Sequence, residues 1–340
     1  MQLNDRINSF ELLGKAISSN KDDIHFVINN AVNHNGWFTA ENVKSALLAI
    51  KEKYLNKAAL TAFAAEQKIP TENKAPKIVG LVMAGNIPLV GFQDLLYVLL
   101  TGNKVQLKLS SKDEFLSKFV INKLIELEPR WKDYIAVEER LHNFDAIIAT
   151  GSNNSSRYFE YYFSKYPNII RKNRNSIAVL SGNEEATAIK NLGEDIFNYF
   201  GLGCRNVSQV LVPKDYDFNS LLKIFEDEFP KLKNQHKYKN NYDYQYSLLL
   251  INGASHKASE NLLLLENENI ASPISCLHFK TYENTGEIQH YLDFKKDEIQ
   301  CVVSEMPEIN KAIAFGKSQQ PSLNDFADNV NVVNFLLNKV

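Results

Sequence analysis

The chain has 340 residues, of which 44% are hydrophobic and 23% are charged, and its formal net charge is -2. This length leaves room for about two domains, and the composition is that of an ordinary globular protein. A charge so close to neutral gives no general attraction to nucleic acid or to an anionic membrane. No apolar run approaches the roughly 18 residues that a bilayer-spanning helix needs. We therefore expect no nucleic-acid partner and no membrane span.

The cysteines and histidines show no metal or disulfide pattern. Three cysteines, Cys204, Cys276 and Cys301, are odd in number and widely spaced, so they form neither a disulfide framework nor a metal knuckle. The histidines are scattered without ligand spacing, and we expect no metal. The first residues lack the basic-then-apolar pattern of a secretory signal. These features favour a cytoplasmic location.

Residues 1–74 are expected to form an N-terminal helical segment. Apolar residues recur at helical spacing around Phe10 and Ile17, and again from 43 to 54. Thr39 is a suitable N-cap for the second of these helices, because its hydroxyl can accept a bond from the first turn. A polar connector from Pro70 to Pro76 ends the segment.

Residues 75–174 alternate between strand and helix patterns, which predicts βαβ units and a parallel sheet. Strands are expected over 77–83, 105–109, 134–137 and 145–149, and helices over 89–100, 115–127 and 155–163. Open α/β sheets bind ligands beyond the carboxyl ends of their strands. The residues that fall at such positions are Gly85, Asn86, Ser110, Gly151 and Ser152.

No GxGxxG motif is present, which argues against an ordinary dinucleotide fingerprint. It does not exclude a nucleotide, because a helix N-terminus binds phosphate without that motif. Gly151 and Ser152 are also consistent with simple turn chemistry. We interpret residues 75–174 as a nucleotide-binding domain.

Residues 175–313 repeat the alternation and are expected to form a second α/β domain. Strands are predicted over 177–180, 207–212, 262–265, 276–279 and 300–303, and helices over 184–200 and 218–229. The segment 231–246 is interpreted as an exposed stretch that runs into a helix over 246–251. Cys276, His278 and Cys301 lie within predicted strands and are expected in the core. Residues 314–340 form a C-terminal return that ends in a β-rich run over 330–337; a strand there needs a partner, and a homodimer would supply one.

Cys204 is the candidate nucleophile of the second domain. It follows Gly201 and Gly203, which let a backbone approach a ligand closely, and it precedes Arg205. A neighbouring cation favours the thiolate, which is the nucleophilic form of cysteine. We predict that Cys204 attacks an acyl group. The alternative is a small buried cysteine at the start of a strand, and Arg205 has the alternative of pairing with a remote carboxylate.

In this order the motifs resemble those of the aldehyde dehydrogenase superfamily, and more closely its acyl-CoA reductase branch, typified by the fatty-acid reductase of bacterial luminescence. Residues 84–88 resemble the superfamily's Asn-x-Pro turn, which makes Asn86 an oxyanion-hole donor. Residues 101–108 resemble the Gly-Asn-x-Val-x-x-Lys strand, which brings Lys108 near the adenosine ribose. Residues 149–152 resemble the Thr-Gly-Ser turn, which places Gly151 and Ser152 near a pyrophosphate.

The second half carries further similarity. Gly203 and Cys204 resemble the nucleophile motif, residues 314–318 are similar to a shortened Phe-Gly-x-x-Lys-x-Ser segment, and residues 37–39 resemble a helix start of the reductase branch. The resemblance implies an aldehyde-dehydrogenase-like α/β fold with two Rossmann-like parallel-sheet domains. Of the two interpretations of Cys204, it favours the nucleophile over the buried cysteine.

Two departures from the superfamily pattern concern carboxylates. The glutamate that activates the hydrolytic water has no counterpart in residues 171–176. Water needs a general base at neutral pH, so an aldehyde-oxidising enzyme requires that glutamate, whereas a thioester reductase does not. The second departure is Asn269, which stands at the place of the glutamate that holds the nicotinamide ribose, with Glu268 one residue earlier.

The resemblance therefore implies reduction of a fatty acyl thioester to the aldehyde. Cys204 would form an acyl-cysteine, and the Asn86 amide and the Cys204 backbone N–H would stabilise the oxyanion. Lys108, with Ser110 nearby, would read a 2′-phosphate, which favours NADPH over NADH; the alternative for Lys108 is a surface lysine at a strand end. The acyl donor is CoA or an acyl carrier protein. A cysteine acyltransferase without a redox step and a catalytically silent scaffold are the alternative functions.

Overall fold

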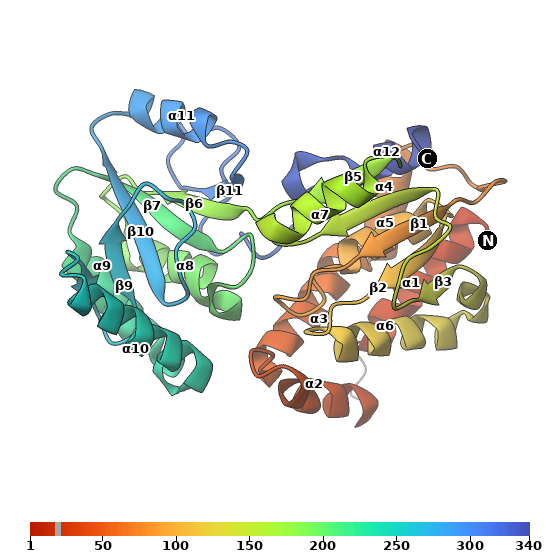
Figure 1. Ribbon diagram of the computed structural model, residues 1–340, viewed down its shortest axis with the longest axis horizontal. Coiled ribbons are helices and arrows are strands. Elements are labelled where there is room, and N and C mark those ends of the chain that lie inside the picture. The colour runs from red at the N-terminus through yellow and green to blue at the C-terminus, as the bar shows by residue number, and fades with distance from the viewer. Residues whose placement is uncertain (18–21) are drawn as a thin grey trace. The chain divides into compact units, whose positions relative to one another are not determined.

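A computed structural model describes residues 1–17 and 22–340 of the chain. The chain divides into two compact units, one formed by Met1–Asn173 with Pro321–Val340 and the other by Arg174–Gln320. Figure 1 shows that each unit contains its own sheet with flanking helices. The first unit is thus built from both the N-terminal and the C-terminal part of the sequence.

The first unit begins with four helices, as the apolar spacing predicts: α1 (Leu3–Ile17), α2 (Asp22–His34), α3 (Ala40–Tyr54) and α4 (Lys57–Glu66). Thr39 is confirmed as the N-cap of α3, because its hydroxyl accepts the Asn42 N–H at 3.3 Å. Phe10 in α1 is fully buried against Trp131. The helices therefore share a hydrophobic core with the sheet that follows them.

The sheet of the first unit has five parallel strands in the order β3-β2-β1-β4-β5. The strands are β1 (Ile78–Val82), β2 (Lys104–Lys108), β3 (Ile135–Val137), β4 (Ala146–Thr150) and β5 (Asn168–Arg171), and the helices between them are α5 (Phe92–Leu100), α6 (Glu114–Leu127) and α7 (Asn153–Phe163). Four of the five strands were predicted. β5 was missed because only its two central residues are apolar, between an asparagine and an arginine.

The C-terminal segment corrects one prediction. Residues 332–338 form helix α12 (Val332–Asn338) and not a strand. Asn331 caps the helix by accepting the Asn334 N–H at 2.8 Å. The apolar side chains at 332, 333, 335 and 336 have the spacing of one helical face and are buried in the core of the first unit. Packing therefore overrides the β-propensity of the valines, and the argument for a homodimer from an unpaired strand no longer holds.

The second unit has a six-stranded sheet in the order β11-β6-β7-β10-β9-β8, parallel except for the short β8. The strands are β6 (Asn175–Val179), β7 (Val207–Pro213), β8 (Lys257–Ala258), β9 (Leu263–Glu266), β10 (Cys276–Tyr282) and β11 (Ile299–Val303), and the helices are α8 (Ala186–Phe197), α9 (Phe218–Glu228), α10 (His236–Ile251) and α11 (Thr285–Phe294).

Helix α10 corrects a second prediction, because it begins at His236, ten residues before the expected start. Gln235 caps it by accepting the Tyr238 N–H at 2.9 Å. Tyr238 and Tyr242, four residues apart, are its buried residues, and both donate hydroxyl bonds to the backbone before β9. This narrow stripe of tyrosines is a weak helical signal in a sequence rich in Lys and Asn.

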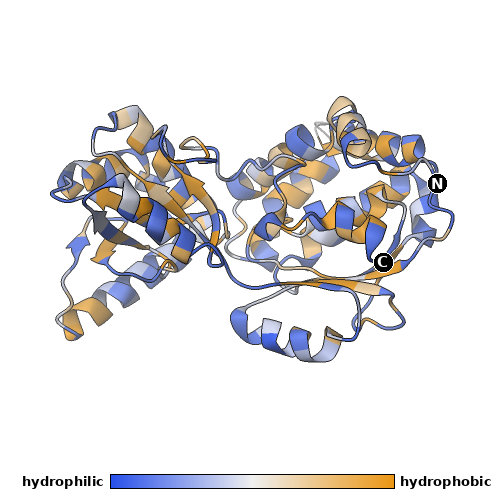
Figure 2. Cartoon of the chain, turned by 90° about the horizontal axis from the view of Figure 1, so that it is seen from above, coloured by the Kyte–Doolittle hydropathy of each residue, from blue (hydrophilic) through white to orange (hydrophobic). Residues whose placement is uncertain are grey.

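The fold class is confirmed: both units are α/β structures built on parallel sheets. Figure 2 shows that the strands of both sheets are largely hydrophobic, whereas the helices carry both colours. Parallel strands buried on both faces read as nearly continuous apolar runs, which is why the sequence located most of them. No helix of the described residues has the length and apolar character needed to cross a membrane.

Candidate active site

The predicted cofactor residues lie at one edge of the sheet in the first unit. β1 lies between β2 and β4, and its last residue, Val82, is in register with both Lys108 and Ala149. The segments that follow these strands therefore leave the sheet at the same edge. This edge carries Lys108, the last residue of β2, and in the segments beyond the strands Gly85, Asn86, Ser110, Gly151 and Ser152.

Two of these positions need glycine. A Cβ on Gly85 would lie 2.6 Å from the Ser110 hydroxyl oxygen, and a Cβ on Gly151 would lie 2.8 Å from the Phe159 ring. Both distances are shorter than a Cβ atom tolerates. The turns after β1 and β4 therefore lie tightly on their neighbours, and Ser110 supports the Asn86 turn directly.

Helix α7 begins at this edge. The Ser152 hydroxyl accepts the Ser155 N–H at 3.2 Å and so caps the helix. The N-terminus of a helix carries partial positive charge and unpaired N–H groups, which suit a phosphate. Lys108 is exposed at the end of β2 and adds a cation. The residues at this edge are thus chemically suited to an anionic dinucleotide.

Asp113 is a buried carboxyl group that packs against the Asn86 turn. It is 3% exposed, and its Oδ2 accepts the Leu89 N–H at 2.8 Å, while Oδ1 is buried without a hydrogen-bond partner. Leu89 itself has a φ of +57°, a strained conformation for a leucine. Burial raises the pKa of Asp113 to about 7, although the hydrogen bonds from the Leu89 N–H and the Ser117 hydroxyl act to lower it.

This raised pKa makes the stability of the first unit depend on pH. The folded state binds a proton that the unfolded chain releases near pH 4, so the stabilisation is complete below that pH and is lost as pH rises through about 7. We expect the free energy of unfolding to fall by about 2–3 kcal/mol between pH 5 and 8. Urea titrations followed by tryptophan fluorescence would measure this, since Trp37 and Trp131 both lie in the first unit.

The Asp113→Asn variant should remove this slope, because the amide keeps an acceptor for Leu89 and cannot ionise. The matched control is Asp133→Asn, which changes an exposed carboxyl in the same unit and should leave the slope in place. An Asp113→Asn protein with the pH slope of the wild type would contradict the assignment.

Cys204 lies in the second unit, in the segment between α8 and β7. The three residues Tyr199, Phe200 and Gly201 have φ values of +53°, +58° and +74°. The left-handed region costs a residue other than glycine about 1–2 kcal/mol. Strain of this kind is concentrated at functional sites, and here it ends three residues before the candidate nucleophile. Cys204 is partly exposed and is not the small buried cysteine of the alternative interpretation.

Asn206 organises this segment. Its side-chain amide donates to the carbonyls of Asp195, Ile196 and Asn198 at 3.0, 3.3 and 2.8 Å. Its Oδ1 accepts the Gly203 N–H at 2.8 Å, and its own N–H donates to the Gly203 carbonyl at 3.0 Å. Cys204 and Arg205 are therefore the two central residues of a turn that Gly203 and Asn206 close twice.

Ser176 fixes the other side of the cysteine. Its hydroxyl donates to the Cys204 carbonyl at 3.0 Å and lies 3.0 Å from the Cys301 sulfur. Arg205 also bonds that sulfur. Burial is the largest influence on Cys301 and raises its pKa, while Arg205 and Ser176 act in the opposite direction. Cys301 was expected in the core, but it is partly exposed and lies beside the Cys204 turn.

Asp195 in α8 is a buried carboxylate whose backbone carbonyl also accepts a bond from Asn206 of this turn. It accepts the backbone N–H groups of Gly316 and Ser318 at 2.6 and 2.9 Å, and burial raises its pKa. It holds the segment 314–318 against α8. Because both oxygens accept backbone N–H groups, Asp195 is a structural group and not a base available to water. An aspartate on the buried face of a predicted helix was the sequence signal that could have revealed it.

The segment 267–270 is held by four side chains. Its successive carbonyls accept bonds from Gln209, Tyr291, His278 and Ser208 at 2.8, 2.9, 2.7 and 2.7 Å. His278 is confirmed as a buried, satisfied residue, and burial lowers its pKa. The Glu268 carboxylate accepts a hydrogen bond from the Lys280 ammonium at 2.6 Å at the surface. It is therefore paired with Lys280 and does not take the place of the missing carboxylate at position 269.

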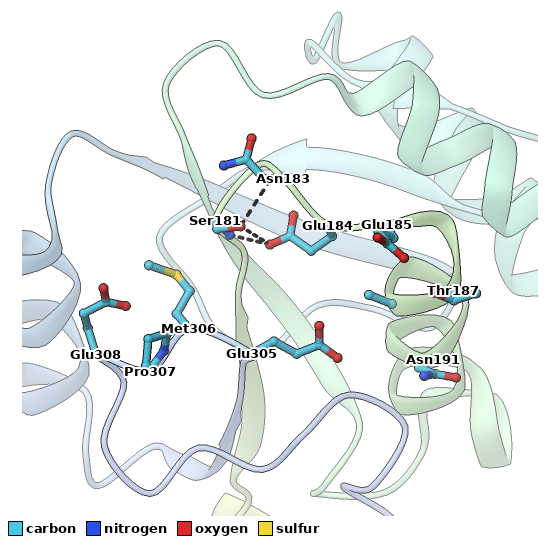
Figure 3. A pocket seen from close by; sticks show the side chains of 11 residues that line it. Ser181, Asn183, Glu184, Glu185, Thr187, Asn191, Glu305, Met306, Pro307 and Glu308 are labelled. Carbon is cyan, nitrogen blue, oxygen red and sulfur yellow. Dashed lines mark hydrogen bonds between the residues drawn. The ribbon is translucent and has the colours of Figure 1, made fainter.

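The second unit also has a pocket of about 590 Å³ at the opposite edge of its sheet. It adjoins the carboxyl ends of β6 and β11, whereas Cys204 precedes the amino end of β7. Figure 3 shows the carboxyl groups around it, with Glu184 bonded to Ser181. Its lining includes Glu184, Glu185, Glu305 and Glu308. So much negative charge does not suit phosphate, and the pocket is separate from the candidate nucleophile.

The remaining cysteine and the possibility of a metal site can be examined directly. Cys276 is confirmed as a core residue: it is 8% exposed, and burial raises its pKa to about 12. Such a thiol is not ionised at neutral pH. Within residues 1–17 and 22–340, no three His, Cys, Asp or Glu side chains are grouped to hold a metal ion.

Comparison with known proteins identifies the class. The profile of the acyl-CoA reductase (LuxC) family matches residues 37–303. The fold is that of aldehyde dehydrogenases, and the resemblance seen in the motifs is confirmed. The chain belongs to the acyl-CoA reductase (LuxC) family. A comparison with curated protein sequences found no match.

Solved structures similar to this chain are aldehyde dehydrogenases at low sequence identity. The enzyme from Mycobacterium tuberculosis, complexed with NAD+, is 12% identical with a TM-score of 0.68, and the match covers 94% of this chain and 76% of that one. Aldehyde dehydrogenase 21 from Physcomitrella patens, with succinate, is 11% identical with a TM-score of 0.72 and coverage of 99% and 84%. Succinic semialdehyde dehydrogenase from Streptococcus pyogenes, with NADP+, is 10% identical with a TM-score of 0.68 and coverage of 89% and 76%.

Proposed function

We propose that this protein reduces a fatty acyl thioester to the aldehyde through an acyl-cysteine at Cys204. The family and fold support an oxidoreductase that acts on acyl or aldehyde groups. The observation that carries the finer assignment is the Cys204 turn, in which a partly exposed cysteine follows a strained segment and its neighbours are fixed by Asn206 and Ser176. Held in this way, the thiolate can attack a carbonyl carbon without first being ordered.

The proposed chemistry begins with attack of the Cys204 thiolate on the thioester carbonyl. The Asn86 amide and the Cys204 N–H are the proposed donors to the oxyanion, and such donors each lower a barrier by about 3–4 kcal/mol. The thiol of CoA, or of a carrier protein, then leaves. A reduced nicotinamide dinucleotide, when bound, would supply a hydride to the acyl carbon. The Cys204–carbon bond would then break, which releases the aldehyde and restores the thiolate. Lys108, Ser110, Gly85, Gly151 and Ser152 are the proposed cofactor residues, and the exposed lysine is the reason to favour NADPH.

Hydrolysis would compete with reduction, because it destroys the acyl-enzyme. The stretch 171–176 has no carboxylate, and the buried Asp195 below the turn is occupied by two backbone N–H groups. Neither provides a general base for water. The acyl-cysteine should therefore persist until hydride arrives, which is what a reductase requires.

The experiment that tests this function combines intact-mass spectrometry with absorbance. The protein is mixed with acyl-CoAs from short to long chain, and one acyl group per chain is expected to appear. Adding NADPH should then remove the acyl mass, release aldehyde and oxidise NADPH in equal amounts. Acylation that is indifferent to NADPH and NADH would instead indicate an acyltransferase. No acylation at any chain length would indicate a binding or scaffold protein.

A further inference from the structure

We propose that Asn206 and Ser176 are positioning residues that hold the reactive sulfur of Cys204 in the orientation that acyl transfer needs. The inference rests on the proposed function of Cys204 but concerns residues to which the family resemblance gives no role. Asn206 is 1% exposed and Ser176 is fully buried, so neither side chain is placed to touch a substrate.

The first step of the argument is the end of helix α8. The last carbonyls of a helix lack intrahelical partners and need a donor when they are buried. The amide of Asn206 supplies it by donating to Asp195, Ile196 and Asn198. One side chain therefore joins the end of α8 to the start of β7, with the Cys204 turn between them.

The second step concerns the peptide groups on either side of the cysteine. The peptide before Cys204 is held at the Gly203 carbonyl by the Asn206 backbone N–H at 3.0 Å, and the peptide after it is held at the Cys204 carbonyl by the Ser176 hydroxyl at 3.0 Å. The Oδ1 of Asn206 holds the Gly203 N–H, one peptide earlier, at 2.8 Å. Fixing the peptides on either side restricts the backbone torsions of Cys204 itself. Only rotation about its Cα–Cβ bond then moves the sulfur.

The third step explains why such restraint is required. The backbone reaches Gly203 through three successive residues in the left-handed region, two of them aromatic. An aromatic residue leaves that region when its surroundings permit. Removing the bonds of Asn206 would let the segment relax, and a shift of about 1 Å in a reacting atom can lower a rate by about 100-fold.

The test compares Asn206→Ala and Ser176→Ala with Asn261→Ala. Asn261 is a matched control, since it is 2% exposed in the same unit and its amide covers carbonyls at the end of α9 in the same way. Acylation of Cys204 by acyl-CoA is expected to slow by about 10- to 100-fold in Asn206→Ala and by about 3- to 10-fold in Ser176→Ala. The rate of alkylation by iodoacetamide should change less than about threefold, since the thiol remains accessible.

Hydrogen exchange separates this inference from the proposed function. Amide protection over residues 199–207 should fall in Asn206→Ala and remain at the wild-type level in Asn261→Ala, whether or not the protein accepts acyl-CoA. Ser176→Ala removes a single hydroxyl, so it keeps the test decisive if Asn206→Ala does not fold. Unchanged acylation in both variants, unchanged protection in Asn206→Ala, or an equal loss in Asn261→Ala would each overturn the proposal.

Discussion

Replacing Cys204 by alanine is expected to abolish both acyl-enzyme formation and NADPH-dependent reduction. Loss of a nucleophile typically lowers turnover by about 10⁴-fold or more, because no other group can form the covalent intermediate. Intact-mass spectrometry after mixing with acyl-CoA should detect no added acyl group. Absorbance at the nicotinamide band should then show no oxidation above the background rate.

The other two cysteines provide matched controls for this prediction. Cys276→Ala removes a buried thiol of high pKa and should retain acylation. Cys301→Ala removes a thiol that contacts both Ser176 and Arg205, and it should also retain acylation. If Cys301→Ala failed to form the acyl-enzyme and Cys204→Ala still formed it, the nucleophile would be Cys301 and the assignment to Cys204 would be wrong.

Replacing Gly102 by alanine is expected to destabilise the first unit by about 3–4 kcal/mol. Gly102 ends helix α5 with a φ of +78°, and its N–H and that of Asn103 bond back to Leu99 and Val98. This is the Schellman arrangement, which favours glycine. A Cβ at this position would also lie 1.9 Å from the Nη1 of the fully buried Arg6.

The collision is costly because Arg6 cannot move away freely. Its Nη2 donates to the carbonyls of Pro70 and Thr71 at 3.0 and 3.3 Å. Displacing the guanidinium would break bonds of a charged donor, each worth about 1.5–3 kcal/mol. The left-handed backbone adds about 1–2 kcal/mol for alanine. Urea unfolding followed by tryptophan fluorescence would report the loss.

A double-mutant cycle isolates the steric part. In an Arg6→Ala background, Gly102→Ala should cost only the left-handed part, about 1–2 kcal/mol. Gly253→Ala is a second control, since Gly253 has a φ of +61° but nothing within 4 Å of its Cβ position. Because it lies in the other unit, circular dichroism is the measurement there. Equal costs for Gly102→Ala in both backgrounds would contradict the role given to Arg6.

The sequence was informative where the signal is local. Parallel strands buried on both faces appear as short apolar runs, so β1, β2, β6 and β7 could be predicted within two residues of their ends. The cap of α3 at Thr39 was predicted from a single side chain. The motifs around Asn86, Lys108, Gly151 and Cys204 indicated the family, because their order along the chain is more specific than any one of them.

The sequence was misleading where long-range packing decides. The valines of α12 favour a strand by propensity, yet the core of the first unit accepts them as one face of a helix. The start of α10 depends on two tyrosines that find acceptors some twenty residues away. Neither interaction is visible in a window of neighbouring residues.

By itself, the sequence determined the fold class, the family and the identity of the candidate nucleophile, because these depend on the order and kind of residues. Only the tertiary structure showed how Cys204 is held. Ser176, Asp195 and Asn206 come from a strand, a helix and a turn, and hydrogen bonds between such segments form only after the sheet has brought them together. A polar side chain buried for this purpose reads, in the sequence, like any other Ser, Asp or Asn.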